Sequence, residues 1–415
     1  MRCSAIATVR AQALVLALAL APACEPAGGA APGGMVGPVP GRAAGTSASG
    51  AARPATGAAA GTAAGAAAES DTGGGPIGAA GGPLPSTVRE VPGQPGLFTV
   101  RRRTFLMTTH WEVAIATRDP AAAEAPITEC FAEIARLESV LSEWKPDTEI
   151  SHVNAAAGVA PVKVSPELIE TLQVALDVGA MTEGGFDITF LPIGRLWKLK
   201  DPAPKLPDPA ELAKAIALVD YRKVKLDRAA GTAFIEKRGM AIGLGGIGQG
   251  IAVDRCSAIL HRRGFDDFIV DGSGDLYVSG RKGTQGWMVG VAHPRIHGYQ
   301  FARLSLTNRA ITTAGDYERY AIIDGKHYHH IIDPKTGYPV EHTVSVTALA
   351  STTVLADALD TGLFVMGADR GLPLIEARAD LDALFVSADG TVRMTSRLVP
   401  IVKLDSTTLD LSTWR

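Results

Sequence analysis

The sequence predicts an α+β fold, a single large mixed domain in which helices pack on an antiparallel-rich sheet, preceded by a disordered tether. From residue 268 onward, short alternating segments separated by turn residues are typical of strands. Helical segments interrupt these strands irregularly, which favours α+β over a doubly wound parallel sheet. The folded domain is expected over residues 98–415, because every aromatic residue and most of the charge lie there.

The first 24 residues have the pattern of an export signal. Arg2 and Arg10 form a short basic region, and the apolar stretch 11–22 is too short to span a bilayer. Cys24 follows small residues, as the lipid-modified Cys of a bacterial lipoprotein does. We therefore expect export to the cell envelope, in the periplasm, with a lipid at Cys24 that anchors the chain to a membrane.

Residues 25–97 have a different composition, dominated by Ala, Gly and Pro and without any Phe, Trp or Tyr. Such a segment cannot bury enough apolar surface to offset its ordering entropy, so we expect a disordered linker. After a lipidated Cys, a linker of this kind would let the domain reach partners near the membrane. The net charge of −3 gives no basic surplus, which argues against a nucleic-acid partner.

Periodicity and capping residues predict the elements of the domain. In the first half these are a strand over 105–115, an amphipathic helix over 125–144, a helix capped by Ser165 that runs to about Met181, a helix that starts at Asp208, and short strands over 221–244. In the second half they are strands over 268–270, 276–280, 287–291, 301–306, 309–313, 318–323, 327–332 and 344–349, with a helix near 368–378. Asp324-Gly325 and Asp389-Gly390 predict hairpin turns. Cys130 and Cys256 are expected to be free and buried rather than bridged.

A helix of about four turns follows Ser351, Thr352 and Thr353, which are good N-cap residues. It is apolar nearly all round, so it should be buried. Asp357, Asp360 and Thr361 nevertheless share one of its faces. Two buried carboxylates need a counter-charge, because desolvating each costs several kcal/mol. The residues alone leave two candidates for it, an Arg or Lys from elsewhere and a hard divalent cation.

Two glycine-rich stretches invite two interpretations each. The stretch 243–250 precedes a helix that runs to about Arg263, and its N–H groups could cradle phosphate or its glycines could allow close packing of helix on strand. Gly184-Gly185, before Phe186 and Asp187, is either a plain turn or a place where the backbone closely approaches another group.

Three histidines cluster beside one tyrosine in the predicted strand 327–332. His327 and His329 should share a face of this strand while His330 points to the other. No Cys accompanies them, and their spacing does not match a zinc site. A functional His that faces a ligand and ordinary surface histidines both remain open.

Several of these stretches together resemble one family, the FAD:protein FMN transferases of the ApbE family. They occur in the family's order and are GGFDIT at 184–189, IGLGGIGQGIAVD at 242–254, DGSGDLYVSG at 271–280, TTAGDYERY at 312–320, HHIIDPKTGYPV at 329–340 and the helical stretch 344–367. The resemblance runs from about Arg103 to the C-terminal strands and implies an ApbE-like catalytic domain over residues 98–415.

The resemblance implies an enzyme that breaks the pyrophosphate of FAD and transfers FMN to a Thr hydroxyl of an exported acceptor flavoprotein, releasing AMP. Its metal would be Mg²⁺, and the family's metal positions correspond to Gly246, Asp357 and Thr361, with the adjacent Asp360. Its FAD positions correspond to Met107, Trp144, Gly185, Phe186, Asp187, Gln249 and His330. His330 is the candidate catalytic residue, which would take the proton of the attacking Thr or hold the phosphate.

Three residues depart from the family's pattern. Gly243 stands where Asp is usual, Gln249 where Lys or Glu is commoner, and Asp271 where Asn is usual. Gly243 motivates one alternative, a flavin-binding protein without transferase activity, and an FAD pyrophosphatase that gives FMN and AMP is a second. If a lost FAD contact can be restored, Gly243→Asp should leave activity equal or higher.

Overall fold

The computed structural model describes residues 8–9, 67–68 and 84–405. Cys24 and most of the predicted export signal (1–24) and linker (25–97) lie outside these described residues. Among the helices of the described chain, none is both long and apolar enough to cross a membrane.

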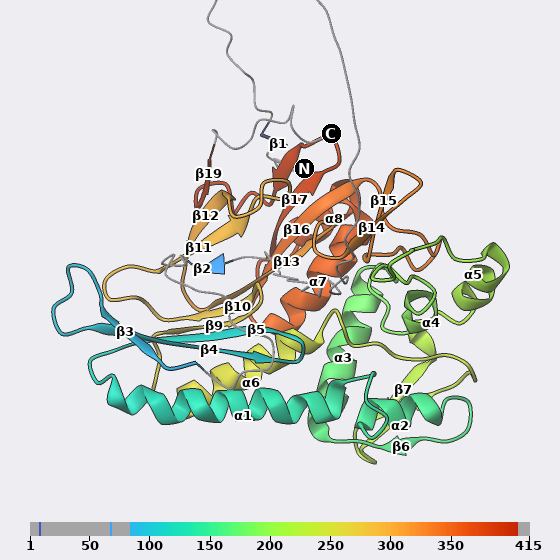
Figure 1. Cartoon of the computed structure of the whole chain (residues 1–415), viewed down its shortest axis with the longest axis horizontal. Coiled ribbons are helices and arrows are strands. Elements are labelled where there is room, and N and C mark those ends of the chain that lie inside the picture. Colours follow the sequence, from blue (N-terminus) through green and yellow to red (C-terminus); the bar gives the residue numbers. More distant parts are fainter. Residues whose placement is uncertain (1–7, 10–66, 69–83, 406–415) are drawn as a thin grey trace, which may run out of the picture. The chain divides into compact units, whose positions relative to one another are not determined.

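The described chain forms an α+β domain of antiparallel sheets and packed helices (Figure 1). Its helices are η1 (Ala121–Ala123), α1 (Glu124–Leu141), α2 (Glu149–Ala155), α3 (Pro166–Met181), α4 (Leu191–Gly194), α5 (Pro209–Ile216), η2 (Tyr221–Lys223), α6 (Gly248–Arg262), α7 (Thr353–Met366) and α8 (Ala368–Glu376). Its strands are β1 (Thr8–Val9), β2 (Ala67–Ala68), β3 (Thr87–Glu90), β4 (Phe98–Leu106), β5 (Thr109–Thr117), β6 (Val162–Lys163), β7 (Val224–Asp227), β8 (Thr232–Ile235), β9 (Phe268–Gly272), β10 (Asp275–Ser279), β11 (Trp287–Ala292), β12 (Gln300–Leu306), β13 (Arg309–Gly315), β14 (Tyr320–Ile323), β15 (Lys326–His329), β16 (Thr343–Ala350), β17 (Asp382–Ser387), β18 (Val392–Met394) and β19 (Val402–Leu404).

The largest sheet has ten strands in the order β1-β18-β17-β16-β13-β10-β9-β5-β4-β3. Smaller sheets join β19-β12-β11-β2, β6-β8-β7 and the hairpin β14-β15. Within the described residues, every pair of neighbouring strands in these sheets is antiparallel. The expectation of an antiparallel-rich sheet rather than a doubly wound parallel one is therefore confirmed.

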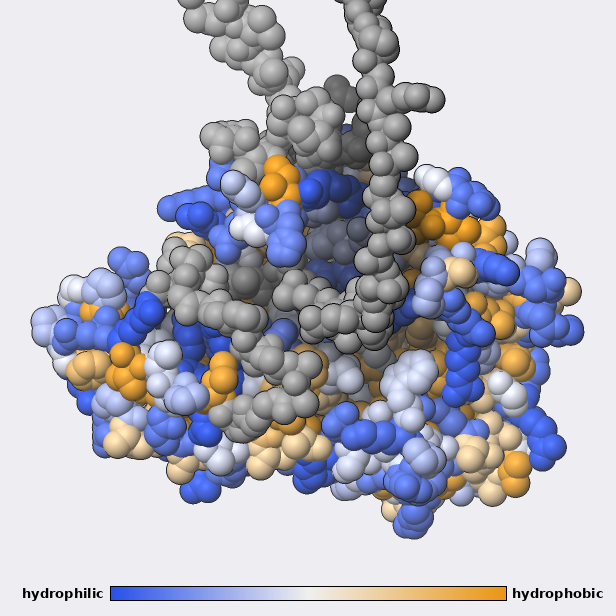
Figure 2. Space-filling view, in the orientation of Figure 1, coloured by the Kyte–Doolittle hydropathy of each residue, from blue (hydrophilic) through white to orange (hydrophobic). Residues whose placement is uncertain are grey.

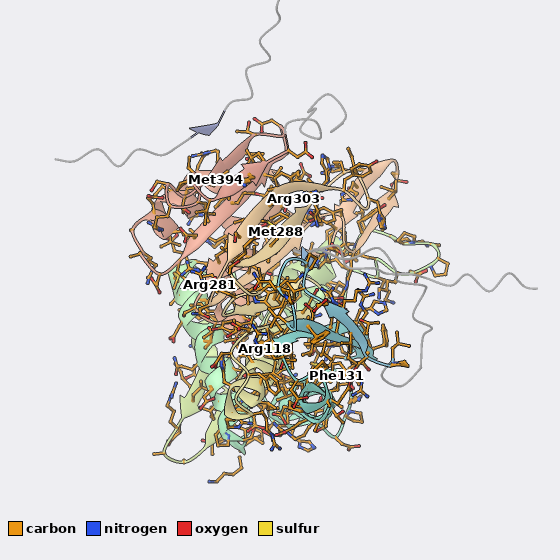
Figure 3. The ribbon with its side chains drawn as sticks, turned by 90° about the vertical axis from the view of Figure 1, so that its left-hand side faces the viewer. Arg118, Phe131, Arg281, Met288, Arg303 and Met394 are labelled. Atoms are coloured by element: carbon orange, nitrogen blue, oxygen red, sulfur yellow. The ribbon has the colours of Figure 1, made fainter. Side chains whose placement is uncertain are left out.

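The largest sheet separates two hydrophobic cores, because successive side chains of a strand point to opposite faces. In β9, Phe268 and Val270 enter the core on the helix side, while Ile269 enters the core shared with β11 and β12. Figure 3 marks these two regions by Phe131, on α1, and by Met394, on β18. Helices α1 and α6 lie together on one side of β4, β5 and β9 (Figure 1).

Several predicted details are confirmed. The Ser165 hydroxyl accepts a hydrogen bond from the Leu168 N–H at the start of α3, and the Asp208 carboxylate caps α5. Asp324 and Gly325 both have positive φ, 50° and 76°, in the two-residue turn between β14 and β15. Such a turn matches the twist of the strands that it joins.

The two cysteines of the domain are free and buried, as predicted. The Cys130 thiol, on α1, donates to the carbonyl oxygen of Cys256, on α6, over 3.5 Å. Burial raises the pKa of the Cys256 thiol well above its usual value, and the neighbouring Cys130 adds to this rise.

The predicted start of the folded domain at residue 98 is wrong. Strand β3 lies within the segment 25–97 predicted as linker, as do residues 84–86 and the two-residue strand β2. All residues of β3 are exposed, and their backbone pairs with β4. Backbone pairing at a sheet edge needs little side-chain burial, so composition gave no sign of it.

The predicted strand over 105–115 is instead a hairpin. Its turn is Met107-Thr108, between β4 and β5, with φ of 48° and 59°. Turns of this kind normally carry Asn or Gly, so the sequence held no turn signal here. Non-glycine residues with positive φ are uncommon, and they cluster at functional sites.

The predicted helix 125–144 ends earlier, at Leu141, and Trp144 is not part of its apolar side. Trp144 lies in the following loop with 77% of its surface exposed. The residue before a proline is disfavoured in helical conformation, and Lys145-Pro146 follows directly. The predicted extension of this helix to Trp144 is therefore wrong.

Helix α7 packs against β13 and β16 and against α6 and α3. Its first N–H groups, of Thr353 and Val354, donate to the carboxylate of Asp254 on α6 over 2.8 and 2.9 Å. The N-cap residue Thr352 makes no side-chain cap hydrogen bond. Capping of α7 by its own Ser and Thr side chains is thus wrong, since a neighbouring helix supplies the acceptor.

Gly250 is the point of closest approach between α6 and α7. A Cβ there would lie 2.7 Å from the backbone oxygen of Thr353 and 2.7 Å from the Cα of Val354. Gly250→Ala should therefore lower the free energy of unfolding by about 1–3 kcal/mol, the usual cost of overpacking. Urea unfolding followed by circular dichroism would measure this change.

Gly248→Ala is the matched control in the same helix, because no atom lies within 4 Å of a Cβ at that position. Ala replaces Gly in a helix with a gain of up to about 1 kcal/mol. Equal unfolding midpoints for Gly250→Ala and Gly248→Ala would contradict the predicted clash.

Candidate functional site

The two carboxylates of α7 lie where the start of α6 meets the sheet. Asp357 and Asp360 are only 5% and 3% exposed. An Oδ2 of Asp357 accepts a hydrogen bond from the Gly250 N–H over 2.9 Å, and the Thr361 hydroxyl donates to Asp360 over 3.2 Å. A Cβ on Gly246 would stand 3.5 Å from the Thr361 hydroxyl. The structure thus brings together the four residues predicted to hold a metal.

No cationic side chain balances this pair among the described residues, because no ion pair involves Asp357 or Asp360. Burial raises the pKa of Asp357 to about 7, although the hydrogen bond from the Gly250 N–H lowers this pKa in part. Burial and the charge of Asp357 raise the pKa of Asp360 well above its usual value. Of the two candidates for a counter-charge, an Arg or Lys partner is therefore not in place.

A third carboxylate, Asp275, was missed from the sequence. It opens β10 directly after Ser273 and Gly274, whose φ values of 60° and 106° form a tight turn. Burial, and then the charges of Asp357 and Asp360, raise the pKa of Asp275 well above its usual value. The signal was present, since an acid follows the glycine turn of the stretch 271–280.

The donor set fits a hard divalent cation, because it consists of carboxylate, hydroxyl and backbone oxygens. Among the described residues, no group of three or more His, Cys, Asp or Glu side chains has metal-binding geometry. An ion here would complete its shell with the Thr361 hydroxyl, backbone at Gly246 and oxygens of a substrate. Mg²⁺ is commonly bound in this way, through one or two carboxylates and substrate phosphates.

The loop after α3 closes on α7. A Cβ on Gly185 would lie 2.8 Å from the Gly362 carbonyl oxygen, and the Phe186 ring lies 3.4 Å from the Cβ position of Gly246. One of the two interpretations of the paired glycines, a close approach of the backbone to another group, is thus confirmed at Gly185. The sequence alone could not choose between this reading and a plain turn.

Asp187 holds this loop in place. Its Oδ1 accepts from the N–H and hydroxyl of Thr189 over 2.8 and 2.6 Å, and its Oδ2 accepts from the Tyr221 N–H over 2.9 Å. Burial raises the pKa of Asp187, against these hydrogen bonds. A contact between Asp187 and FAD stays a prediction, since both carboxylate oxygens already bind protein donors.

Strand β15 carries His327 and His329 and contacts α7 through the His329 ring. The Nε2 of His329 lies 2.6 Å from the Val340 carbonyl oxygen, and its ring packs on Phe364 of α7 with centroids 5.6 Å apart. The backbone N–H of His330 donates a hydrogen bond to the backbone carbonyl oxygen of Arg319 over 3.0 Å. Burial, with the charge of Arg319, lowers the pKa of His330 to about 4, so its imidazole is neutral at pH 7.

The three remaining candidates lie on three separate elements of the chain. Met107 occupies the strained β4–β5 turn, Gln249 is the second residue of α6, and Trp144 is in the exposed loop after α1. The contacts that join the carboxylate cluster do not include these three side chains.

Figure 2 shows hydrophobic residues at the upper right, where Figure 1 places the hairpin β14–β15. In this hairpin, Tyr320 and Ile322 are exposed by 50% and 56%.

A family model, that of the ApbE family, matches residues 107–385. The chain belongs to the ApbE family. It is 32% identical over 320 residues to the FAD:protein FMN transferase of Treponema pallidum (strain Nichols), covering 73% of this chain and 88% of the relative. It is also 32% identical over 278 residues to an FAD:protein FMN transferase of Klebsiella pneumoniae (strain 342), covering 65% and 79%.

Solved ApbE structures have the same fold. The flavin transferase ApbE from Vibrio cholerae superposes with a TM-score of 0.66 at 26% identity, covering 74% of this chain and 99% of that one. The ApbE protein of Thermotoga maritima gives a TM-score of 0.67 at 26% identity, covering 73% and 99%. The predicted ApbE-like fold is therefore confirmed.

Asp357→Asn should stabilise this ApbE-family protein in metal-free buffer at pH 8. Folding favours the neutral carboxyl, because the folded pKa of about 7 exceeds the ordinary value of 3.8. Stability from this group is thus present at acid pH and lost as the pH rises through about 7. Asn stays neutral and still accepts from the Gly250 N–H, so the gain should be a few kcal/mol at pH 8.

The gain should vanish at pH 4, where Asp357 itself is neutral. Thermal unfolding with a chelator at both pH values would measure it. Asp324→Asn, in an exposed turn, is the control and should show no gain that depends on pH. A variant Asp357→Asn that is less stable than the parent at pH 8 would refute the charge repulsion.

Proposed function

We propose that this ApbE-family protein transfers the FMN part of FAD to a threonine hydroxyl of an exported acceptor flavoprotein, with Mg²⁺, and releases AMP. The observation that carries the proposal is the buried pair Asp357 and Asp360, which lacks a cationic partner among the described residues. The Thr361 hydroxyl and the glycine-rich start of α6 adjoin this pair. A pyrophosphate needs such surroundings, in which a cation and backbone donors share its charge.

In the proposed reaction, a bond forms between the acceptor's Thr oxygen and the FMN phosphorus. The bond from that phosphorus to the bridging oxygen breaks, and the bridging oxygen leaves with AMP. Mg²⁺ held by Asp357, Asp360, Thr361 and the Gly246 backbone would supply neutralisation of the phosphate charge. The neutral imidazole of His330 would accept the hydroxyl proton or bind a phosphate oxygen.

The proposal includes export to the periplasm and a lipid at Cys24 that anchors the chain to a membrane. It rests on the basic residues, the short apolar stretch and the small residues before Cys24. An anchored enzyme would meet exported acceptor proteins at the membrane surface. Metabolic labelling with palmitate, lost in Cys24→Ser, would test the anchor.

A single assay separates the three candidate activities. The protein, FAD and Mg²⁺ are mixed with an exported acceptor domain that carries an accessible Thr, and the acceptor's mass is measured. Transfer predicts a gain of one FMN on that Thr, with AMP released. Tight FAD binding with an unmodified acceptor would instead indicate a binding protein, and AMP release without acceptor would indicate a pyrophosphatase.

Asp357→Ala should abolish Mg²⁺-dependent transfer while the domain stays folded. The substitution removes a proposed metal ligand from a helix that apolar packing holds in place. Acceptor mass and circular dichroism would be recorded together. Full activity in this variant would rule out the assigned metal site.

His330→Ala should slow transfer about 10²–10⁴-fold, the usual contribution of a proton acceptor. His327→Ala, in the exposed part of the same hairpin, is the control and should keep the parent rate. Single-turnover rates and the Kd for FAD would be measured for both. A rise in Kd that accounts for the whole loss would assign His330 to FAD binding, and an unchanged rate would remove it from the site.

A further inference from the structure

The backbone before the glycine-rich turn is rigidly held. The Asn154 side chain pairs with both backbone groups of Ile242, accepting from its N–H over 2.7 Å and donating to its carbonyl oxygen over 2.9 Å. The next N–H, of Gly243, donates to the Ile188 carbonyl oxygen over 2.8 Å. The Cα of Gly243 therefore has a fixed position relative to its neighbours.

A carboxylate faces this glycine from another element. The Oε1 of Glu143, in the loop after α1, lies 3.6 Å from where a Cβ of Gly243 would stand. Burial raises the pKa of Glu143, while the N–H groups of Glu143 and Leu244 and the charge of Arg195 oppose this rise. Such a carboxylate is costly to bury, and a structural tie to one loop could be made by a neutral side chain.

The carboxylate also lies beside the proposed FAD site. Gly243 begins the turn that leads to Gly246, which adjoins the Thr361 hydroxyl. Glu143 directly precedes Trp144, whose ring is exposed and free to stack on a ligand. The Glu143 carboxylate thus approaches Gly243, in the turn that leads to the proposed metal ligand Gly246, and Trp144 is the next residue in the chain.

We propose that Glu143 is an FAD-binding residue, whose carboxylate accepts a hydrogen bond from a hydroxyl or amine group of the nucleotide. Because Gly243 has no side chain, the space beside it is bordered by the Leu191 side chain, 3.4 Å from the Cβ position, and by this carboxylate. This inference rests on the proposed function, because it assumes that FAD is the ligand.

The geometry reverses the sequence-based expectation for Gly243→Asp. An Asp at this position would put a second carboxylate against that of Glu143, and like charges in contact disfavour ionisation of both. Gly243→Asp alone should weaken FAD binding at pH 8. Removing the first carboxylate in Glu143→Ala/Gly243→Asp should relieve the repulsion and return one acid to the site.

The test measures the Kd for FAD by quenching of flavin fluorescence, with Mg²⁺, on the full chain. Glu143→Gln should raise the Kd at least tenfold, since Gln keeps the size of the side chain but loses a charged hydrogen bond. Glu170→Gln, at an exposed carboxylate of α3, is the matched control and should bind FAD as the parent does. Competition with AMP and with FMN identifies the half of FAD that Glu143 contacts, because only that competitor should lose affinity in Glu143→Gln.

The double variant keeps the inference falsifiable if Glu143→Gln folds poorly. Glu143→Ala/Gly243→Asp should bind FAD within about threefold of the parent, and Glu143→Ala alone should not. Unchanged FAD affinity in Glu143→Gln, or a double variant no better than Glu143→Ala, would overturn the inference. A parent protein that binds FAD without transferring FMN would overturn the proposed function and leave this inference standing.

Discussion

Two like charges buried on one helix, Asp357 and Asp360, are the constraint on which the rest of the structure depends. Each carboxylate loses several kcal/mol of hydration, and their proximity adds repulsion. The protein supplies a few fixed donors, among them the Gly250 N–H and the Thr361 hydroxyl. These donors balance only part of the charge, so the arrangement is stable chiefly because apolar packing holds α7 on β13 and β16. A cation would relieve the remainder.

Glycine is what lets backbone rather than side chain surround these carboxylates. At Gly250 and Gly185 a single methyl group would collide with backbone atoms of α7, 2.7 and 2.8 Å away. Backbone donors have little freedom to turn, so they keep their direction whether or not a ligand is present. This is the preorganisation that phosphoryl transfer requires, since positioning and charge stabilisation supply most of its catalysis.

The sequence predicted the elements that follow local rules and missed those set by distant contacts. Ser165 and Asp208 cap their helices as expected, and Asp324-Gly325 makes its hairpin, because these signals act within a few residues. Neither Met107 nor Thr108 is a typical turn residue. The alternation of apolar and polar residues therefore predicted one continuous strand where the chain makes a hairpin. The Asp254 cap of α7 and the approach of Glu143 to Gly243 join residues about a hundred positions apart, which only the folded chain reveals.

The burial of the Cys130 and Cys256 thiols has a consequence for how this protein would react with oxidants. The thiolate is the reactive form of cysteine, and burial suppresses it in Cys256. The two residues join α1 and α6, so both thiols stay shielded while these helices remain packed. Oxidation would then act on molecules in which α1 and α6 have separated. The two thiols therefore stay reduced only while α1 and α6 remain packed together.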